Sequence, residues 1–390
     1  MLFLGCLFDR SLENEILKKT DGIISNAANT FQWNVIDGLI ENKITPKIIN
    51  VLPVGCFPKK YKQLFLDDRN WQYKNCECCE IGSINIPIFK QYFRYRKILK
   101  QIKKSDDYNI LIYSTYMPFL KAVYKLNNKF NITLIVTDLP EYYDLANTSK
   151  LKHIIRRLYN IKIDKYLNRI NKYVLLTEQM RDKLEIYNKP YIIVEGICNR
   201  DDHITKDNYT DNNKKIILYT GTLNYKYGIR NLLDAFDLIE NEDYELRICG
   251  NGEAKNEIIE RMKKNQRIKF YGYLNKNEIK KMQQKCTALI NPRMNDEEYT
   301  KYSFPSKTME YLQSGKPVIM YKLDGIPSEY DDYLNYVNGK NTVDLKNKII
   351  EVCSKDTMEL NKYGKKASEW VAREKNCSVQ TKRIIELMRL

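Results

Sequence analysis

Residue types that bind a nucleotide diphosphate gather in one stretch of the second half of the chain. An Asn-Pro-Arg sequence ending at Arg293 follows an apolar run, and a predicted helix over residues 306–313 begins Ser-Lys. Arg293 is expected at the carboxyl edge of a parallel sheet, where α/β folds bind ligands, and the free amides at the helix start favour an anion there. Lys307, in the first helical turn, opposes the helix dipole unless an anion is held nearby. This stretch therefore predicts a diphosphate site.

Glu310 adds a group for the sugar part of a nucleotide. It lies near the helix face of Lys307 and Ser306, so its carboxylate can accept two hydrogen bonds from the vicinal hydroxyls of a ribose. The alternative is that Lys307 and Glu310 form an ordinary i, i+3 ion pair on the helix surface, which contributes little. Taken alone, Lys307 and Glu310 favour the surface ion pair, whereas the surrounding motifs favour ribose binding by Glu310.

Two glycine turns precede this stretch. One holds Gly221 and Thr222, with Lys226 shortly after, and the other holds Gly250 and Gly252. Each turn follows a predicted strand and opens a helix, so its backbone can approach a phosphate or a base closely. Two such turns on successive strands strengthen the prediction of a nucleotide site.

The first half of the chain offers candidates for a second substrate. Asp138 follows a predicted strand and could orient an attacking hydroxyl or support positive charge at an anomeric carbon; an Asx turn before a proline is the alternative. Asn29, Gln32 and Trp33 lie in the first strand-to-helix region. A tryptophan beside amides suits a sugar ring, and core packing of Trp33 is equally consistent with the sequence.

Length and charge limit the class of protein. With 390 residues the chain is expected to form two domains, each with its own core. A net charge of +16 attracts anions, whether nucleic acid, an acidic membrane surface or phosphorylated small molecules. No apolar run approaches the length of a bilayer span, and the opening MLFLGCLF is expected to be a first buried strand rather than a signal sequence.

Cysteine usage points to reduced thiols in a cytosol. The chain has ten cysteines and only two histidines, and we find no secretion signal. Cys76, Cys78 and Cys79 lack a second pair at zinc-finger spacing, so ordinary thiols are the favoured interpretation and no metal site is expected.

Alternating β-branched runs and helical stretches predict an α/β fold throughout. In the second half, strands are expected at residues 215–220, 245–249, 268–271, 288–291 and 317–321. Helices are expected at 229–240, 253–264, 276–285 and 306–313. The first half repeats the rhythm, with strands near 2–7, 47–52, 110–113, 132–137, 173–176 and 191–194. The polar stretch 199–213 is the expected linker, which gives domains over 1–198 and 199–375, and a C-terminal helix over 376–390 that packs back toward the first domain.

Two basic stretches in the first half, residues 90–104 and 150–172, interleave cations with apolar and aromatic residues. An interfacial helix on a membrane has this pattern. A solvated helix face in a basic protein is the alternative, and the sequence leaves both open.

The motifs of the second half, taken in order, resemble the donor domain of glycosyltransferase family four over residues 214–333. They are Gly221-Thr-Leu, Gly250-Asn-Gly, Tyr271-Gly-Tyr-Leu, Asn291-Pro-Arg, Phe304-Pro-Ser-Lys, Glu310-Tyr and Ser314-Gly-Lys-Pro-Val-Ile. The first half adds Asn29-Thr-Phe-Gln32-Trp33-Asn, Leu52-Pro-Val, Thr137-Asp138-Leu-Pro-Glu141-Tyr and Glu195-Gly-Ile. These are similar to a branch of the family found in clusters for capsule, exopolysaccharide or O-antigen assembly.

This resemblance implies a GT-B fold, in which two Rossmann-like doubly wound domains face each other across a cleft. The second domain would hold the donor and the first the acceptor, with retention of anomeric configuration and no divalent metal or other cofactor; no Asp-x-Asp occurs. The implied catalytic residues are Asp138, Arg293 and Lys307. The implied donor-binding residues are Gly221, Thr222, Lys226, Gly250, Gly252, Tyr273, Ser303, Phe304, Ser306 and Glu310, and the implied acceptor-binding residues are Asn29, Gln32, Trp33 and Glu141.

The chain also departs from the family pattern. Glu310 matches the second of two family glutamates, whereas Tyr302 stands at the first, and Ser303 and Pro305 replace glycines. Thr222 stands where a basic residue is common, and Lys226 lies one residue before a usual lysine position.

The expected function is a hexosyltransferase reaction from a nucleotide-diphosphate donor, expected to be a UDP-sugar, to a lipid-linked oligosaccharide. The protein would act in the cytoplasm, at the anionic inner face of the plasma membrane, in surface polysaccharide biosynthesis. One alternative is a Rossmann epimerase or oxidoreductase, although the first strand lacks G-x-G-x-x-G. A more remote one is a nucleic-acid-binding protein, supported by charge alone, so no nucleic-acid partner is expected.

Overall fold

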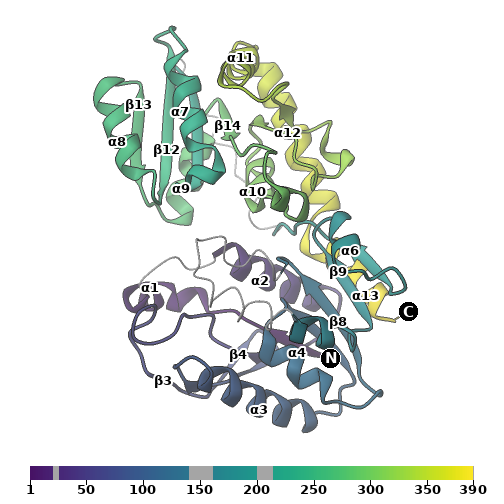
Figure 1. Ribbon diagram of the computed structural model, residues 1–390. Coiled ribbons are helices and arrows are strands. Elements are labelled where there is room, and N and C mark those ends of the chain that lie inside the picture. The colour runs from purple at the N-terminus through teal and green to yellow at the C-terminus, as the bar shows by residue number, and fades with distance from the viewer. Residues whose placement is uncertain (21–25, 140–160, 200–213, 390) are drawn as a thin grey trace. The chain divides into compact units, whose positions relative to one another are not determined.

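The computed structural model describes residues 1–20, 26–139, 161–199 and 214–389. They form two compact units, one made of Met1–Ile197 with Cys377–Leu390 and the other of Cys198–Asn376 (Figure 1). The expected linker, apart from Asn199, lies outside the described residues, as does the first part of the basic stretch at 150–172.

The first unit is built on an eight-stranded sheet in the order β10-β9-β8-β7-β1-β2-β5-β4. The strands are β1 (Leu2–Gly5), β2 (Lys47–Asn50), β4 (Arg69–Tyr73), β5 (Cys76–Glu80), β7 (Asn109–Tyr113), β8 (Asn131–Val136), β9 (Lys172–Leu175) and β10 (Tyr191–Ile193). All neighbours pair in parallel except β4, which runs antiparallel to β5. The expected parallel strands are confirmed, and the β4–β5 hairpin extends the sheet beyond them.

Helices and a small second sheet complete the first unit. The helices are α1 (Glu13–Lys19), α2 (Asn26–Glu41), α3 (Phe89–Lys103), α4 (Met117–Tyr124), α6 (Gln179–Lys183) and α13 (Cys377–Arg389), with the 3-10 turn η1 (Arg10–Leu12). Strands β3 (Phe65–Leu66) and β6 (Ser83–Ile84) pair antiparallel. Although α13 ends the chain, it packs with α2 and shares the core of this unit: Ile384 is buried with Trp33, and the Asn42 side chain donates to the Ser378 carbonyl at 2.9 Å.

The second unit is a six-stranded parallel sheet in the order β13-β12-β11-β14-β15-β16. Its strands are β11 (Lys215–Thr222), β12 (Tyr244–Asn251), β13 (Ile268–Gly272), β14 (Ala288–Asn291), β15 (Val318–Met320) and β16 (Asn335–Tyr336). Its helices are α7 (Ile229–Asp237), α8 (Lys255–Lys264), α9 (Lys276–Gln284), α10 (Ser306–Gln313), α11 (Thr342–Cys353) and α12 (Thr357–Glu374), with 3-10 turns η4 (Tyr225–Tyr227), η5 (Glu298–Tyr302) and η6 (Ser328–Tyr330).

Both faces of this second sheet are covered by helices. Alternate residues of β11 enter different cores: Ile217 packs with apolar residues of α7 and α11, and Ile216 and Leu218 pack with those of α10 and α12. A strand buried on both faces is an apolar run rather than an alternating pattern, as the sequence here shows. The strand order reverses between β11 and β14, so the carboxyl ends of these two strands mark the place where such sheets bind ligands.

The described residues carry no disulfide and no membrane-spanning helix. All ten cysteines lie in the described residues as thiols rather than disulfides, with Cys76 and Cys78 buried in β5. In the described part of the chain, no helix is both long and apolar enough to cross a bilayer.

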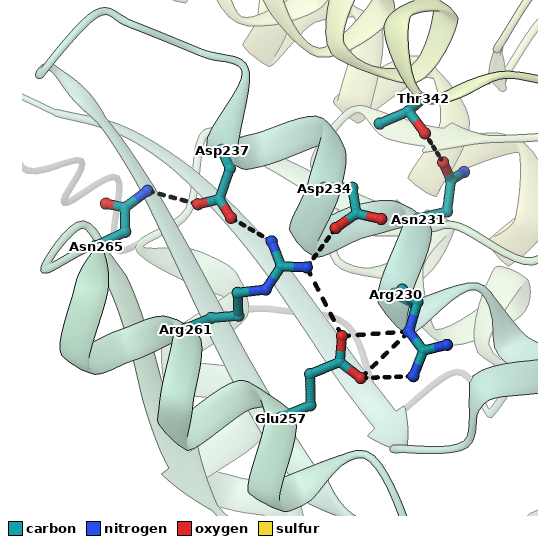
Figure 2. Close-up of polar contacts among 8 residues, drawn as sticks. All are labelled: Arg230, Asn231, Asp234, Asp237, Glu257, Arg261, Asn265 and Thr342. Carbon is teal, nitrogen blue, oxygen red and sulfur yellow. Dashed lines mark hydrogen bonds and ion pairs between the residues drawn. The ribbon is translucent and has the colours of Figure 1, made fainter.

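An ion-pair network joins α7 to α8 in the second unit (Figure 2). The guanidinium of Arg261 on α8 donates to carboxylates of Asp234 and Asp237 on α7 and lies 3.8 Å from Glu257, which itself pairs with Arg230 at 3.0 Å. The Arg261 side chain is partly buried, so solvent screens the network less than an isolated surface pair.

Replacing Arg261 with leucine is expected to lower the stability of this unit by about 1–2 kcal/mol, because three carboxylates would lose their shared cation. The matched control is Lys263→Leu on the same helix, which breaks an exposed pair with Glu260 and is expected to cost about 0.5 kcal/mol or less. Amide hydrogen exchange of α7 and α8 measures the stability that each variant loses in this unit. Equal loss of protection in both variants would contradict the role given to the network.

Candidate active site

The predicted donor residues gather at the carboxyl edge of the second sheet. Gly221 pairs with Gly250 where β11 and β12 end, and Arg293 follows the end of β14 by two residues. Because β11 and β14 are neighbours on either side of the reversal in strand order, these residues stand where a doubly wound sheet binds its ligand.

Arg293 is a buried cation in a neutral setting. Its side chain is 7% exposed, and one terminal nitrogen donates to the Ser303 hydroxyl at 2.8 Å. The guanidinium lies 4.7 Å from the ring centroid of Tyr299 and 5.8 Å from that of Tyr227, and its Nε is buried without a hydrogen-bond partner. No carboxylate among the described residues pairs with it. A buried guanidinium with spare donors and no acid partner is suited to an anionic ligand.

Helix α10 is fixed against this edge by Tyr311. The buried Tyr311 hydroxyl accepts from the backbone N–H of Thr220 and donates to its carbonyl, both at 2.9 Å. These bonds tie the helix to the end of β11. The residue before the helix is Pro305, and no side chain caps its first turn, so α10 presents uncapped amides as anion-binding helix starts do.

Lys307 and Glu310 contact each other on α10. The Lys307 ammonium lies 2.8 Å from one carboxylate oxygen of Glu310, and the Gln283 amide donates to the other oxygen at 2.8 Å. Both side chains remain partly exposed. The i, i+3 ion pair considered from the sequence therefore forms in this structure, and contact of either residue with a donor stays a prediction.

The other predicted donor residues lie at several depths. Gly221, Thr222 and Ser303 are partly buried, whereas Lys226, Tyr273 and Ser306 are exposed. The Lys226 ammonium lies 5.2 Å from the Tyr227 ring centroid. Phe304 is buried in the core, with its ring 5.3 Å from that of Tyr330, so its side chain positions the turn before α10.

The two glycine turns pack backbone against backbone so closely that no side chain fits between them. A Cβ on Gly250 would lie 1.8 Å from the Gly221 carbonyl oxygen, and one on Gly252 would lie 2.4 Å from that of Leu223. Gly250 also has a φ of +146°. The two turns are therefore locked together, which shapes the sheet edge whether or not a phosphate approaches it.

The variant Gly250→Ala is expected to lose about 2–3 kcal/mol or more of stability, since clash adds to backbone strain. Gly272→Ala is the matched control because Gly272 also has a positive φ, +68°, but a Cβ there meets nothing within 4 Å. It should lose only about 1–2 kcal/mol. Hydrogen exchange of β11 and β12 measures both, and equal losses would show that the close approach is unimportant.

The acceptor-side candidates of the first unit hold its first turn in place. Asn29 accepts from the Phe8 N–H at 2.9 Å, and Trp33 donates to the Phe8 carbonyl at 3.0 Å. The Gln32 amide bonds both the N–H and the carbonyl of Cys6, at 2.7 and 2.8 Å. All three side chains are buried, and Trp33 packs in the core as the sequence alternative proposed. They position this loop, and their contact with an acceptor stays a prediction.

Asp138 and Glu141 follow β8. Protein atoms close to the Asp138 carboxyl partly desolvate it and so raise its pKa to about 6, although the residue keeps an exposed surface. Glu141 lies outside the described residues. The described residues contain no group of three or more His, Cys, Asp or Glu that could hold a metal ion.

Several residues of the site were not predicted from the sequence. Tyr311 anchors α10, Gln283 orients Glu310, and the rings of Tyr227 and Tyr299 flank Arg293. The sequence carries a local signal for Tyr311, which falls on the buried face of the predicted helix. A buried tyrosine needs a partner for its hydroxyl, so this position could have predicted an anchoring hydrogen bond.

Comparison with known proteins fits this geometry. Residues 201–370 match the family described as Glycosyl transferases group 1. The matched residues lie within the second unit, Cys198–Asn376. The protein is thus an enzyme of the glycosyltransferase class, as the sequence predicted, and the Rossmann oxidoreductase alternative is not favoured.

Solved structures extend the likeness beyond that domain. TarM from S. aureus, in complex with UDP, has a TM-score of 0.59 at 15% identity; the match covers 80% of this glycosyltransferase and 60% of the TarM chain. Sucrose-phosphate synthase from Thermosynechococcus elongatus has a TM-score of 0.71 at 12% identity, covering 100% and 98% of the two chains. The lipopolysaccharide outer core galactosyltransferase WaaB has a TM-score of 0.62 at 13% identity, also covering 100% and 98%. The predicted GT-B fold with two Rossmann-like domains is confirmed. No curated protein matches the sequence.

Proposed function

We propose that the protein is a retaining glycosyltransferase that moves a sugar from a UDP-sugar to a lipid-linked oligosaccharide in surface polysaccharide biosynthesis. The observation that carries this proposal is Arg293, a buried cation without an acid partner among the described residues, at the carboxyl edge of the sheet in the unit that matches the group 1 glycosyltransferases. Support for the donor comes from TarM, solved with UDP. Support for the pathway comes from WaaB, which acts on lipopolysaccharide outer core.

In the proposed reaction the acceptor oxygen bonds to the anomeric carbon as the bond from that carbon to the diphosphate oxygen breaks. The acceptor proton passes to the departing diphosphate on the same face. Arg293, Lys307 and the amides of α10 would stabilise the negative charge that develops on the diphosphate, without a divalent metal. Glu310 would exchange its contacts with Lys307 and Gln283 for ribose hydroxyls. Asp138 would orient the acceptor hydroxyl or support positive charge at the anomeric carbon.

The outer face of α3 supports a membrane location. Phe89, Tyr92 and Phe93 are exposed on this face, and the next turns continue it with exposed Arg96, Lys100 and Lys103; with Ile88, which is 81% exposed, these residues form the α3 patch. Helical spacing places them on one side of the helix. Exposed aromatics followed by cations suit the interface of an anionic bilayer, so the proposed site of action is the cytoplasmic face of the plasma membrane.

A panel of sugar nucleotides tests the donor site, scored by slow donor hydrolysis and by thermal stabilisation. UDP-sugars are expected to give the strongest response, and Lys307→Ala and Glu310→Ala should weaken it by about tenfold each, the loss of one charged or bidentate hydrogen-bond contact. Lys301→Ala, which removes an exposed cation on η5, is the control. If both site variants respond as the parent does, the donor assignment is wrong. Binding of NAD, or of nucleic acid with no turnover of any sugar nucleotide, would favour the alternatives.

A further inference from the structure

Two cations of α3 point away from the α3 patch into the first unit. Lys90 and Arg94 lie one turn apart on the helix, and their side chains are only 5% and 2% exposed. They share a stripe with buried Ile98 and Ile102, on the opposite side from Phe89. Charged side chains are seldom buried this fully without a charged partner.

The partners of these cations are neutral. The Lys90 ammonium donates to the Val54 carbonyl at 2.5 Å. Arg94 donates to the Leu52 carbonyl at 3.0 Å and to the Tyr116 hydroxyl at 3.1 Å, and its Nε is buried without a partner.

No carboxylate forms an ion pair with either cation in the described part of the chain. The carboxylate of Glu80 feels the charge of Arg94, but its hydrogen bond is with the Asn50 side chain, which donates to it at 3.1 Å. Burial, and then the neighbouring charge of Arg94, lower the pKa of Lys90 to about 7. Below that pH both side chains are charged. Two adjacent buried cations that meet only neutral oxygens are costly to the fold, and an anion between them would offset that cost.

The location is a ligand-binding edge. Leu52 and Val54 follow β2, Tyr116 follows β7, and Cys6, whose thiol feels both cations, follows β1. Strands β2, β1 and β7 are neighbours in parallel, so these segments leave the sheet at the same carboxyl edge. That edge is where α/β sheets bind ligands.

We propose that Lys90 and Arg94 bind a phosphate group of the acceptor, so that the acceptor is a phosphate or diphosphate ester. This inference rests on the proposed glycosyl transfer and narrows its acceptor class. A helix with its side chains is about 10–12 Å across. The phosphate would therefore bind on one side of α3 while the α3 patch meets lipid on the other, which suits the headgroup of a lipid phosphate.

The test measures phosphate binding with saturating UDP present, so that the diphosphate site of the second unit is already filled. The probes are geranyl phosphate, a hexose phosphate, inorganic phosphate and geraniol, titrated by calorimetry into the full chain. Lys90→Met and Arg94→Gln are compared with the parent, and Lys97→Met is the matched control. Lys97 lies on the same helix but pairs with Asp68 on the surface at 2.7 Å. Circular dichroism and UDP binding check that each variant is folded.

Geranyl phosphate is expected to bind the parent and Lys97→Met alike and to bind Lys90→Met and Arg94→Gln at least about tenfold more weakly, with no binding of geraniol. Tighter binding of the hexose phosphate than of geranyl phosphate would support a soluble phosphosugar as the source of the same phosphate. The proposal is overturned if no phosphate probe binds the parent, or if folded Lys90→Met binds geranyl phosphate as the parent does. A chain that fails to bind UDP would instead refute the proposed function, and the UDP titration reports that separately.

Discussion

With methionine in place of Arg293, the enzyme is expected to transfer sugar about 10²–10³-fold more slowly at saturating donor and acceptor. The guanidinium has a free Nε and no acid partner, so its donors are available for charge on the leaving diphosphate. That charge is greatest when the bond to the sugar breaks, so removal of Arg293 should lower kcat more than it raises the KM for the donor.

Protein stability separates this effect from misfolding. Methionine fills a similar volume, and no carboxylate among the described residues would lose its cation. The free energy of unfolding of the variant should therefore lie within about 1 kcal/mol of that of the parent. Lys301→Met, a nearby exposed cation, should keep kcat within about twofold. Steady-state kinetics with the best donor of the panel decide the matter. A folded Arg293→Met enzyme with the kcat of the parent would remove Arg293 from the proposed mechanism.

The sequence was most informative where strands are buried on both faces. Residues 288–291 and the helix at 306–313 were predicted with the bounds found for β14 and α10, because an apolar run and a helix start with a proline are strong local signals. The hairpin of β4 and β5 was missed because three of the five residues of β4 are polar and the buried positions of β5 are two cysteines and Glu80. Its stability comes from pairing with β2, which local sequence does not reveal.

The site was predicted in its charged residues but not in their contacts. Chain order placed these residues at one sheet edge, because Arg293 closely follows β14 and Lys307 and Glu310 lie on α10, the next α-helix along the chain. The bonds from Gln283 to Glu310 and from Tyr311 to Thr220 link α9, α10 and β11, and such contacts depend on tertiary packing. No local pattern specifies them.

The basic stretch at residues 90–104 shows how periodicity can separate roles within one helix. The sequence left open an interfacial helix or a solvated basic face. Lys90 and Arg94 belong to neither face, because they fall in the i, i+4 series of Ile98 and Ile102 and are buried with them. Arg96 and Lys100 fall on the opposite, exposed face. The burial of the first pair was therefore readable from helical spacing, and its neutral surroundings were not.

The triple variant Phe89→Ser, Tyr92→Ser, Phe93→Ser is expected to bind vesicles containing phosphatidylserine about 10²-fold more weakly than the parent. Each exposed ring of the α3 patch would bury apolar area at the lipid interface, and the combined loss is about 3 kcal/mol. Vesicle cosedimentation measures it. Because Arg96, Lys100 and Lys103 remain, residual binding should keep its dependence on salt and on anionic lipid.

The matched control removes three exposed apolar side chains from the second unit: Leu238→Ser, Val343→Ser, Met358→Ser. Leu238 follows α7, Val343 lies on α11 and Met358 lies on α12, so the three do not form one apolar face of a helix. The control should therefore bind vesicles as the parent does. Donor hydrolysis in solution should be the same in both triple variants, since neither changes the donor-binding residues. If the α3 variant binds anionic vesicles as tightly as the control, the aromatic face of α3 does not bind the membrane. The basic face would then be a solvated surface, and the lipid-linked acceptor would lose its structural support.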